Sequence, residues 1–309
     1  MNDPFSDASF HKPPRGHQAM VLGDLSIQLH MPKATRSRFD ERGTELVQKI
    51  APSALAETYD VSDFPNAPAH WARTDSTRGV VSHFTVVEPG HMAWLDLRQN
   101  ESHSHHVAAV ISDQGLNALS RQEVTRPVKL EQYVKVCPTH GTRFDRGRFC
   151  EACNYEWPAQ NYVATTKITR GMFWNDGWRT QDGKTRERIF TEDVARGVAA
   201  ARIHDERINA FGVALFLSKQ PKPRPNYGQT RGGGWLGGAL EATRSIEIGA
   251  GALVNQTVEA DDRSLDFWKE TPDVMFLIYY VGQVEFESIV GSVPERRGND
   301  FDKTPVGNP

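Results

Sequence analysis

The sequence predicts a β-rich α+β fold with mainly antiparallel sheets and few helices. Short runs that alternate apolar and polar residues recur along the 309-residue chain, separated by turn residues such as Pro89-Gly90. Helical features are confined to two segments, residues 39–59 and 191–203. Hydrophobic residues make up 38% of the chain and charged residues 24%. This composition is typical of a globular protein, and the length suits one large domain or two smaller ones.

Residues 1–17 form a polar, proline-containing stretch, which predicts a mobile tail. The following β-rich body, residues 18–218, holds most of the predicted strands. They span residues 20–31, 79–88, 91–99, 105–112, 126–136 and 210–218. Asp182-Gly183 lies between two apolar-polar runs and predicts a hairpin turn.

The two helical segments carry different signals. Residues 39–59 begin near Asp40, a residue type that caps helices, and Pro52 would interrupt this helix. Residues 191–203 have Thr191 as an N-cap and acids in the first turn. The apolar side chains that share one face of this second helix are Val194, Val198 and Ile203.

The composition changes after the body. Residues 219–239 are basic and rich in glycine and proline, which predicts a long loop or linker. Residues 240–290 are expected to complete the same body with three strands, at 244–251, 253–260 and 273–281. The last of these is apolar on both faces, so it is expected in the middle of a sheet. Residues 291–309 are expected to be a second mobile tail.

All three cysteines of the chain lie between residues 137 and 153. Cys137, His140, Cys150 and Cys153 form a C-x2-H-x9-C-x2-C pattern. Zn²⁺ takes four nitrogen or sulfur ligands at the corners of a tetrahedron, and two short ligand pairs supply them from two facing turns. Gly141 follows the first pair and Asn154 the second, and both residue types tolerate the left-handed backbone of a tight turn. The pattern predicts one zinc ion.

This pattern resembles a zinc ribbon or zinc knuckle, with His140 where many ribbons have a cysteine. The resemblance covers about twenty residues and implies an inserted hairpin at 134–160. A complete set of three cysteines and one histidine leaves no open coordination position, so the site is expected to be structural rather than catalytic. A redox dithiol at Cys150 and Cys153 is the alternative, and it leaves Cys137 and His140 unexplained.

A second metal site is considered at the histidines of residues 91–106. His103 and His105 would point the same way on a strand, as ligands of a β-sheet metal site do. The polar surroundings of these two residues favour solvated surface histidines instead. With His91, they could serve a metal-dependent hydrolase, together with a group of acids further along the chain. These acids are Glu259, Asp261, Asp262 and Asp266.

The glycine-rich stretch Gly232–Gly237 formally matches G-x-G-x-x-G, but the preceding residues contain too many prolines for a central strand. A dinucleotide site is therefore excluded, and no phosphate-binding loop motif occurs. Basic residues within 219–244 surround Tyr227 and Trp235, which suits a contact with a partner protein or single-stranded nucleic acid. A solvated flexible linker is the alternative.

Charge and hydropathy narrow the functional classes. The net charge of −3 argues against a dedicated nucleic-acid-binding protein. No run of about 18 apolar residues predicts a membrane span, and the polar N-terminus lacks the apolar region of a secretory signal. Three cysteines in metal-ligand spacing do not form a disulfide framework. A cytoplasmic location is expected.

These observations lead to three functional interpretations. The first is a non-enzymatic cytoplasmic scaffold or self-assembling subunit with one structural zinc ion, which contacts partners through residues 219–239. The second is the metal-dependent hydrolase that uses His91, His103 and His105. The third is a nucleic-acid-binding module, and the overall acidic charge makes it the least favoured.

Overall fold

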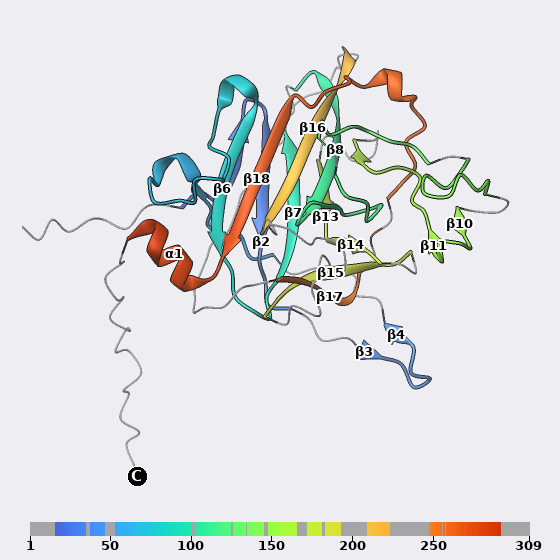
Figure 1. Ribbon diagram of the computed structural model, residues 1–309, viewed down its shortest axis with the longest axis horizontal. Coiled ribbons are helices and arrows are strands. Elements are labelled where there is room, and N and C mark those ends of the chain that lie inside the picture. The colour runs from blue at the N-terminus through green and yellow to red at the C-terminus, as the bar shows by residue number, and fades with distance from the viewer. Residues whose placement is uncertain are drawn as a thin grey trace, which may run out of the picture.

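The structure is a computed structural model, and Figure 1 shows its arrangement. It describes residues 16–34, 38–46, 53–100, 103–124, 126–133, 135–144, 148–165, 172–180, 183–192, 209–222, 247–254, 256 and 258–291. Within these ranges the chain forms two seven-stranded sheets and two small two-stranded hairpins. The β-rich prediction is confirmed.

The first sheet has the order β1-β2-β7-β15-β14, with β13 paired to β7 and β17 paired to β15. Its strands are β1 (Met20–Leu22), β2 (Leu25–His30), β7 (Met92–Gln99), β13 (Met172–Asn175), β14 (Gly177–Arg179), β15 (Thr185–Thr191) and β17 (Glu247–Val254). The predicted hairpin between β14 and β15 is confirmed, and Gly183 takes a positive φ of 79° in its turn. The predicted strand 20–31 is divided by a turn into β1 and β2.

The second sheet has the order β12-β8-β16-β18-β6-β5, with β9 paired to β8. Its strands are β5 (Tyr59–Asp60), β6 (Val80–Val86), β8 (His105–Asp113), β9 (Leu116–Asn117), β12 (Val163–Ala164), β16 (Ala210–Pro221) and β18 (Val274–Val281). The pairing of β18 with β6 is parallel, and the other strand pairings in the described ranges are antiparallel.

The main core lies between the two sheets. Strands from both sheets contribute side chains to it, among them Ile27, Leu97, Val213, Phe276 and Ile278. The second sheet is also covered on its outer face. There, the segment that follows β5, which contains the 3₁₀ turn η1 (Val61–Asp63), packs with the helix α1 (Gln283–Val290) against β6 and β18. β18 therefore lies between β16 and β6 and is buried on both faces, as its apolar sequence predicts.

One ion pair crosses the core between the sheets. Arg188 of β15 and Asp113 of β8 are both fully buried, and the guanidinium Nε lies 2.8 Å from the carboxylate. Arg188 also donates to the backbone oxygen of Asn175, at 3.1 Å. A charge buried this deeply requires a partner, so the pair fixes how the two sheets sit on each other.

The predicted helix at 39–59 is wrong in the described residues. Residues 38–46 form a small hairpin of β3 (Arg38–Phe39) and β4 (Glu45–Leu46). The Asp40 carboxylate accepts hydrogen bonds from the backbone N–H groups of Arg42 and Thr44, at 2.9 and 2.8 Å, and Gly43 has φ of 77°. Asp40 thus closes a turn instead of starting a helix, because an aspartate oxygen can satisfy nearby N–H groups in either structure.

The strand predictions at 126–136 and within 244–260 also need correction. Residues 126–136 form no ladder in the described parts; they contribute isolated bridges at Gln132 and Val136. Near residues 244–260, the described chain has the single strand β17 in place of two strands, and it ends at Val254. Helix α1 was not predicted. Four predicted segments lie mostly outside the described residues: the helix 191–203, the loop 219–239 and the tails at 1–17 and 291–309.

The structure contains short helical elements besides α1. They are the 3₁₀ turns η1, η2 (Ser76–Arg78) and η4 (Leu265–Phe267). In the described part of the chain, no helix is long and apolar enough to cross a membrane.

Candidate metal centre

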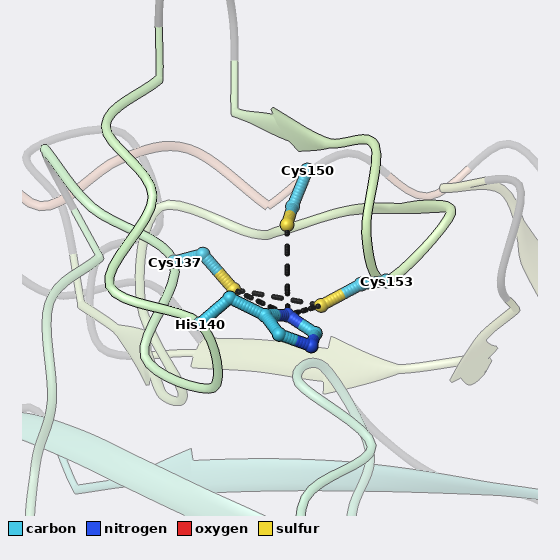
Figure 2. Close-up of side chains that lie close together, drawn as sticks. All are labelled: Cys137, His140, Cys150 and Cys153. Carbon is cyan, nitrogen blue, oxygen red and sulfur yellow. Dashed lines mark hydrogen bonds between the residues drawn. The ribbon is translucent and has the colours of Figure 1, made fainter.

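Four side chains from residues 137–153 meet beyond the edge of the large sheets (Figure 1). The donor atoms of Cys137, His140, Cys150 and Cys153 all lie within 4.8 Å of one another. Figure 2 shows the three sulfur atoms directed at the same nitrogen of the His140 ring. That atom, Nδ1, lies 3.1 Å from the Cys153 sulfur and 3.8 Å from each of the other two sulfurs. The structure thus brings together the complete set that the sequence spacing predicts.

The spacing of these atoms fits a tetrahedral zinc ion. With Zn–S bonds of about 2.3 Å and a Zn–N bond of about 2.0 Å, two sulfurs of a tetrahedron lie about 3.8 Å apart and a sulfur and a nitrogen about 3.5 Å apart. The Cys137 and Cys153 sulfurs are 3.5 Å apart, and the sulfur–nitrogen distances are 3.1 to 3.8 Å. The donors therefore surround a space of the size that Zn²⁺ occupies.

The first ligand pair lies on a tight turn. The Gly141 N–H donates to the Cys137 carbonyl, and the Cys137 N–H donates to the Thr142 carbonyl, both at 2.8 Å. Gly141 has φ of 66°, a left-handed value that its lack of a side chain permits. This turn directs Cys137 and His140 to the same side.

The second ligand pair lies on a short hairpin, formed by β10 (Phe149–Cys150) and β11 (Tyr155–Glu156). Asn154 takes the left-handed conformation in its turn, with φ of 47°, and its N–H donates to the Glu151 carbonyl at 3.0 Å. Asparagine is among the few residues other than glycine that adopt this conformation readily. The turn brings the sulfur of Cys153 back toward that of Cys150.

The electrostatics of the cluster suit a cation. Burial opposes ionisation of the Cys137 thiol, but hydrogen bonds from the backbone N–H of His140 and from other neighbours lower its pKa to about 6. Burial raises the pKa of the Cys153 thiol to about 12, and the sulfurs of Cys137 and Cys150 add to this rise. The cluster alone thus favours one thiolate and disfavours a second. A divalent cation supplies the positive charge that stabilises all three.

A small apolar core supports the cluster from the protein side. Cys137 and Cys150 are buried with Tyr133, Tyr155 and Trp157. The Trp157 ring contacts both tyrosine rings edge to face, at centroid distances of 5.1 and 5.3 Å. Such aromatic pairs add to the stability gained from burial. This core is separate from the one between the sheets.

Several contacts close the base of this unit and join it to the body. At its base, the Tyr133 N–H donates to the Ala159 carbonyl at 2.7 Å, which holds the entering and leaving chains side by side. The Tyr155 hydroxyl donates to the Leu119 carbonyl at 3.0 Å. Glu156 of β11 lies 3.8 Å from the guanidinium of Arg179 on β14.

The arginines of the connecting arm have different surroundings. Arg148 is half-buried, and its Nε donates to the Trp157 carbonyl at 3.1 Å. Arg143 is exposed, and Arg146 lies outside the described residues. Arg148 therefore helps to close the hairpin.

The histidines considered for a second metal site do not assemble into one in the described ranges. His91 precedes β7 and His103 follows it, so a strand of roughly 25–30 Å lies between them. The rings of His103 and His105 are 6.2 Å apart. Among the described residues, the group around Cys137 is the only set of three or more metal donors within ligand distance.

His103 and His105 have local partners instead. The Nδ1 atom of His103 lies 4.0 Å from the Asp24 carboxylate, and that of His105 lies 2.8 Å from the Ser218 carbonyl oxygen. Burial and the nearby Lys222 ammonium lower the pKa of His103. Both histidines therefore make local contacts around the start of β8.

The acids near residue 260 do not form a paired catalytic set. The Asp261 carboxylate accepts hydrogen bonds from the Tyr162 hydroxyl and the Trp268 indole, each at 3.0 Å, and forms an ion pair with Arg263. It therefore holds its own loop against the second sheet. The other acids of this group are exposed: Glu259, Asp262 and Asp266.

A functional inference for this chain rests on its own sequence and structure. No protein-family model, no curated protein and no solved structure matches this sequence.

Proposed function

We propose that this protein is a non-enzymatic scaffold or self-assembling structural subunit, in which one Zn²⁺ ion holds residues 134–160 as a ribbon-like unit. The observation that carries the proposal is the convergence of four donor atoms within 4.8 Å. Three sulfurs and one imidazole nitrogen complete a tetrahedron, and they leave no position for a substrate or a reactive water. The ion would thus act as a cross-link.

The surroundings of the cluster support a structural role. Cys137 and Cys150 are 0% and 1% exposed, so a substrate could not reach their sulfurs without a rearrangement. A core of two tyrosines and one tryptophan is too small to hold about twenty residues in place without a metal or a disulfide. A metal cross-link meets this need in a chain whose cysteines form no disulfide.

The assembly part of the proposal rests on surfaces. The unit extends beyond the large sheets (Figure 1) and exposes apolar side chains at Val136 and Phe149. We expect contacts between chains there, and also through the loop 219–239, most of which lies outside the described residues.

Elemental analysis and light scattering test the proposal. Protein produced in zinc-supplemented medium should contain one zinc ion per chain, and this ion should be lost in a Cys137→Ser/Cys150→Ser variant. The native protein should form an oligomer of defined mass. Protein without zinc would refute the metal site, and a strictly monomeric species at working concentration would refute the assembly role.

A further inference from the structure

The three cysteines of the metal centre differ in their access to solvent. Cys137 and Cys150 are 0% and 1% exposed, whereas Cys153 is only half-buried. Cys153 lies in the turn between β10 and β11, and its two chain neighbours, Ala152 and Asn154, are exposed. Of the three cysteines, Cys153 is therefore the one most accessible to a small oxidant from solvent.

A second sulfur lies next to that of Cys153. The Cys137 and Cys153 sulfurs are 3.5 Å apart. A disulfide bond is about 2.05 Å long, so an approach of about 1.5 Å would join them. Neither residue belongs to a strand, whereas the backbone of Cys150 is held in β10 by its pairing with Tyr155. The geometry thus favours Cys137 as the partner of Cys153.

We propose that Cys137 and Cys153 form a redox switch, in which hydrogen peroxide replaces the zinc cross-link by a disulfide between the same two turns. The Cys153 thiolate attacks one peroxide oxygen, so that an S–O bond forms, the O–O bond breaks and hydroxide leaves. The Cys137 thiolate then attacks the sulfur of this sulfenic acid, forms the S–S bond and displaces a second hydroxide. The two sulfurs supply the two electrons that reduce the peroxide. Zn²⁺ loses two of its four ligands and is released.

This arrangement makes the oxidation reversible and keeps the ribbon-like unit closed. Cys137 is close enough to capture the sulfenic acid before more peroxide converts it to a sulfinic acid, which thiols do not reduce. The disulfide joins the first ligand turn to the β10–β11 hairpin, as the zinc ion does, so the unit stays folded while its metal leaves. A thiol reductant and zinc restore the original state. The inference concerns regulation of the zinc site and rests on the proposed function.

Peptide mapping of the zinc-loaded native chain tests the pairing without any substitution. Trypsin cleaves after three basic residues around the cluster, which are Lys135, Arg143 and Arg148. It therefore separates Cys137 from the other two cysteines, and cleavage after Glu151 separates Cys150 from Cys153. After treatment with hydrogen peroxide and alkylation of the free thiols, we expect a disulfide between the peptides of Cys137 and Cys153, with Cys150 alkylated.

Zinc release is measured in the same samples with a chromophoric chelator. We expect one zinc ion to be released for each disulfide formed, while the alkylated thiols fall from three to one per chain. Dithiothreitol with added zinc should restore both values. Hydrogen exchange over residues 148–157 should be slower in the oxidised chain than in the reduced chain without zinc, because the disulfide takes over the cross-link.

Two cysteine variants form a matched pair, because each lacks one of the four ligands. Both are compared with zinc in excess, so that the remaining ligands stay loaded. Cys150→Ser keeps the proposed pair and should form the disulfide at least as fast as the native chain. Cys153→Ser keeps only the two buried cysteines, so its disulfide formation should be at least about tenfold slower.

The outcomes separate this inference from the proposed function. A disulfide between Cys150 and Cys153 would overturn the inference, as would sulfinic acid at Cys153 without a disulfide. Equal oxidation rates in the two variants would also overturn it. Zinc retained with three reduced thiols in excess peroxide would overturn the switch and leave the zinc ion as a permanent cross-link. A chain that contains no zinc would refute both the switch and the metal site.

Discussion

Replacing Cys150 by serine should weaken zinc binding and unfold the ribbon-like unit while the two sheets stay folded. The Cys150 side chain is 1% exposed and lies in β10, where its sulfur is 3.8 Å from the Nδ1 atom of His140. A serine hydroxyl is a shorter and much poorer ligand than a thiolate, so one corner of the tetrahedron is lost. The small aromatic core of the unit then loses its cross-link.

The size of the effect follows from the number of ligands. Structural zinc sites of this kind bind with about 10–16 kcal/mol at pH 7, so an equal share for one of four ligands is about 2.5–4 kcal/mol. This corresponds to a roughly hundredfold to thousandfold loss of zinc affinity. The core between the sheets should be spared, because it contains no residue between Leu119 and Val163.

Two measurements check this prediction. Competition with a chromophoric chelator gives the zinc affinity, and hydrogen exchange with mass spectrometry compares peptides over 148–157 with peptides over β8. We expect exchange to rise in the first and to stay slow in the second. Thr139→Ala, which changes an exposed side chain between two ligands, is the control. The reasoning is refuted if Cys150→Ser binds zinc as tightly as the native chain, or if β8 loses protection in parallel.

Three further predictions concern the body and its junction with the ribbon-like unit. Asp113→Asn leaves the fully buried Arg188 guanidinium without its counter-ion, so the free energy of unfolding in urea should fall by about 3–5 kcal/mol; an unchanged midpoint would contradict this. Burial lowers the pKa of His83 from 6.5 to about 4, so only the unfolded state gains this proton between those values. As pH falls from 6.5 to 4, this histidine should therefore remove about 3 kcal/mol of stability. In His83→Asn, the free energy of unfolding measured in urea should depend less on pH over that range. Tyr155→Phe removes the hydrogen bond to Leu119 and should cost about 1 kcal/mol, seen as faster exchange in 148–157 with zinc content unchanged.

The strands that the sequence predicts correctly are those with strong local patterns. β6, β7, β8, β16 and β18 each contain a long apolar or alternating run that is buried against other strands. Such runs show that a strand exists, and in β18 that it is buried on both faces. They do not show which strand lies beside it, so the parallel pairing of β18 with β6 could not be predicted.

The errors have local causes. The hairpin at 38–46 was predicted as a helix because Asp40 is as suitable for capping a helix as for closing a turn, and the Gly43 conformation decided the outcome. Asp113 lies at the end of β8. Its burial opposite Arg188 depends on how the two sheets pack together, and the sequence near either residue gives no sign of it.

The set of four candidate metal ligands could be predicted from the sequence alone. Cys137 and His140, and likewise Cys150 and Cys153, are separated by two residues, and this spacing places both members of a pair on one tight turn whatever surrounds them. The tertiary structure decided where this unit sits and what it presents. The Tyr155–Leu119 contact joins residues 36 positions apart, and the Arg188–Asp113 pair joins residues 75 positions apart. Contacts between residues this far apart in the chain depend on how the sheets and loops pack. Such packing produces no local repeat or residue spacing, so the sequence does not predict it.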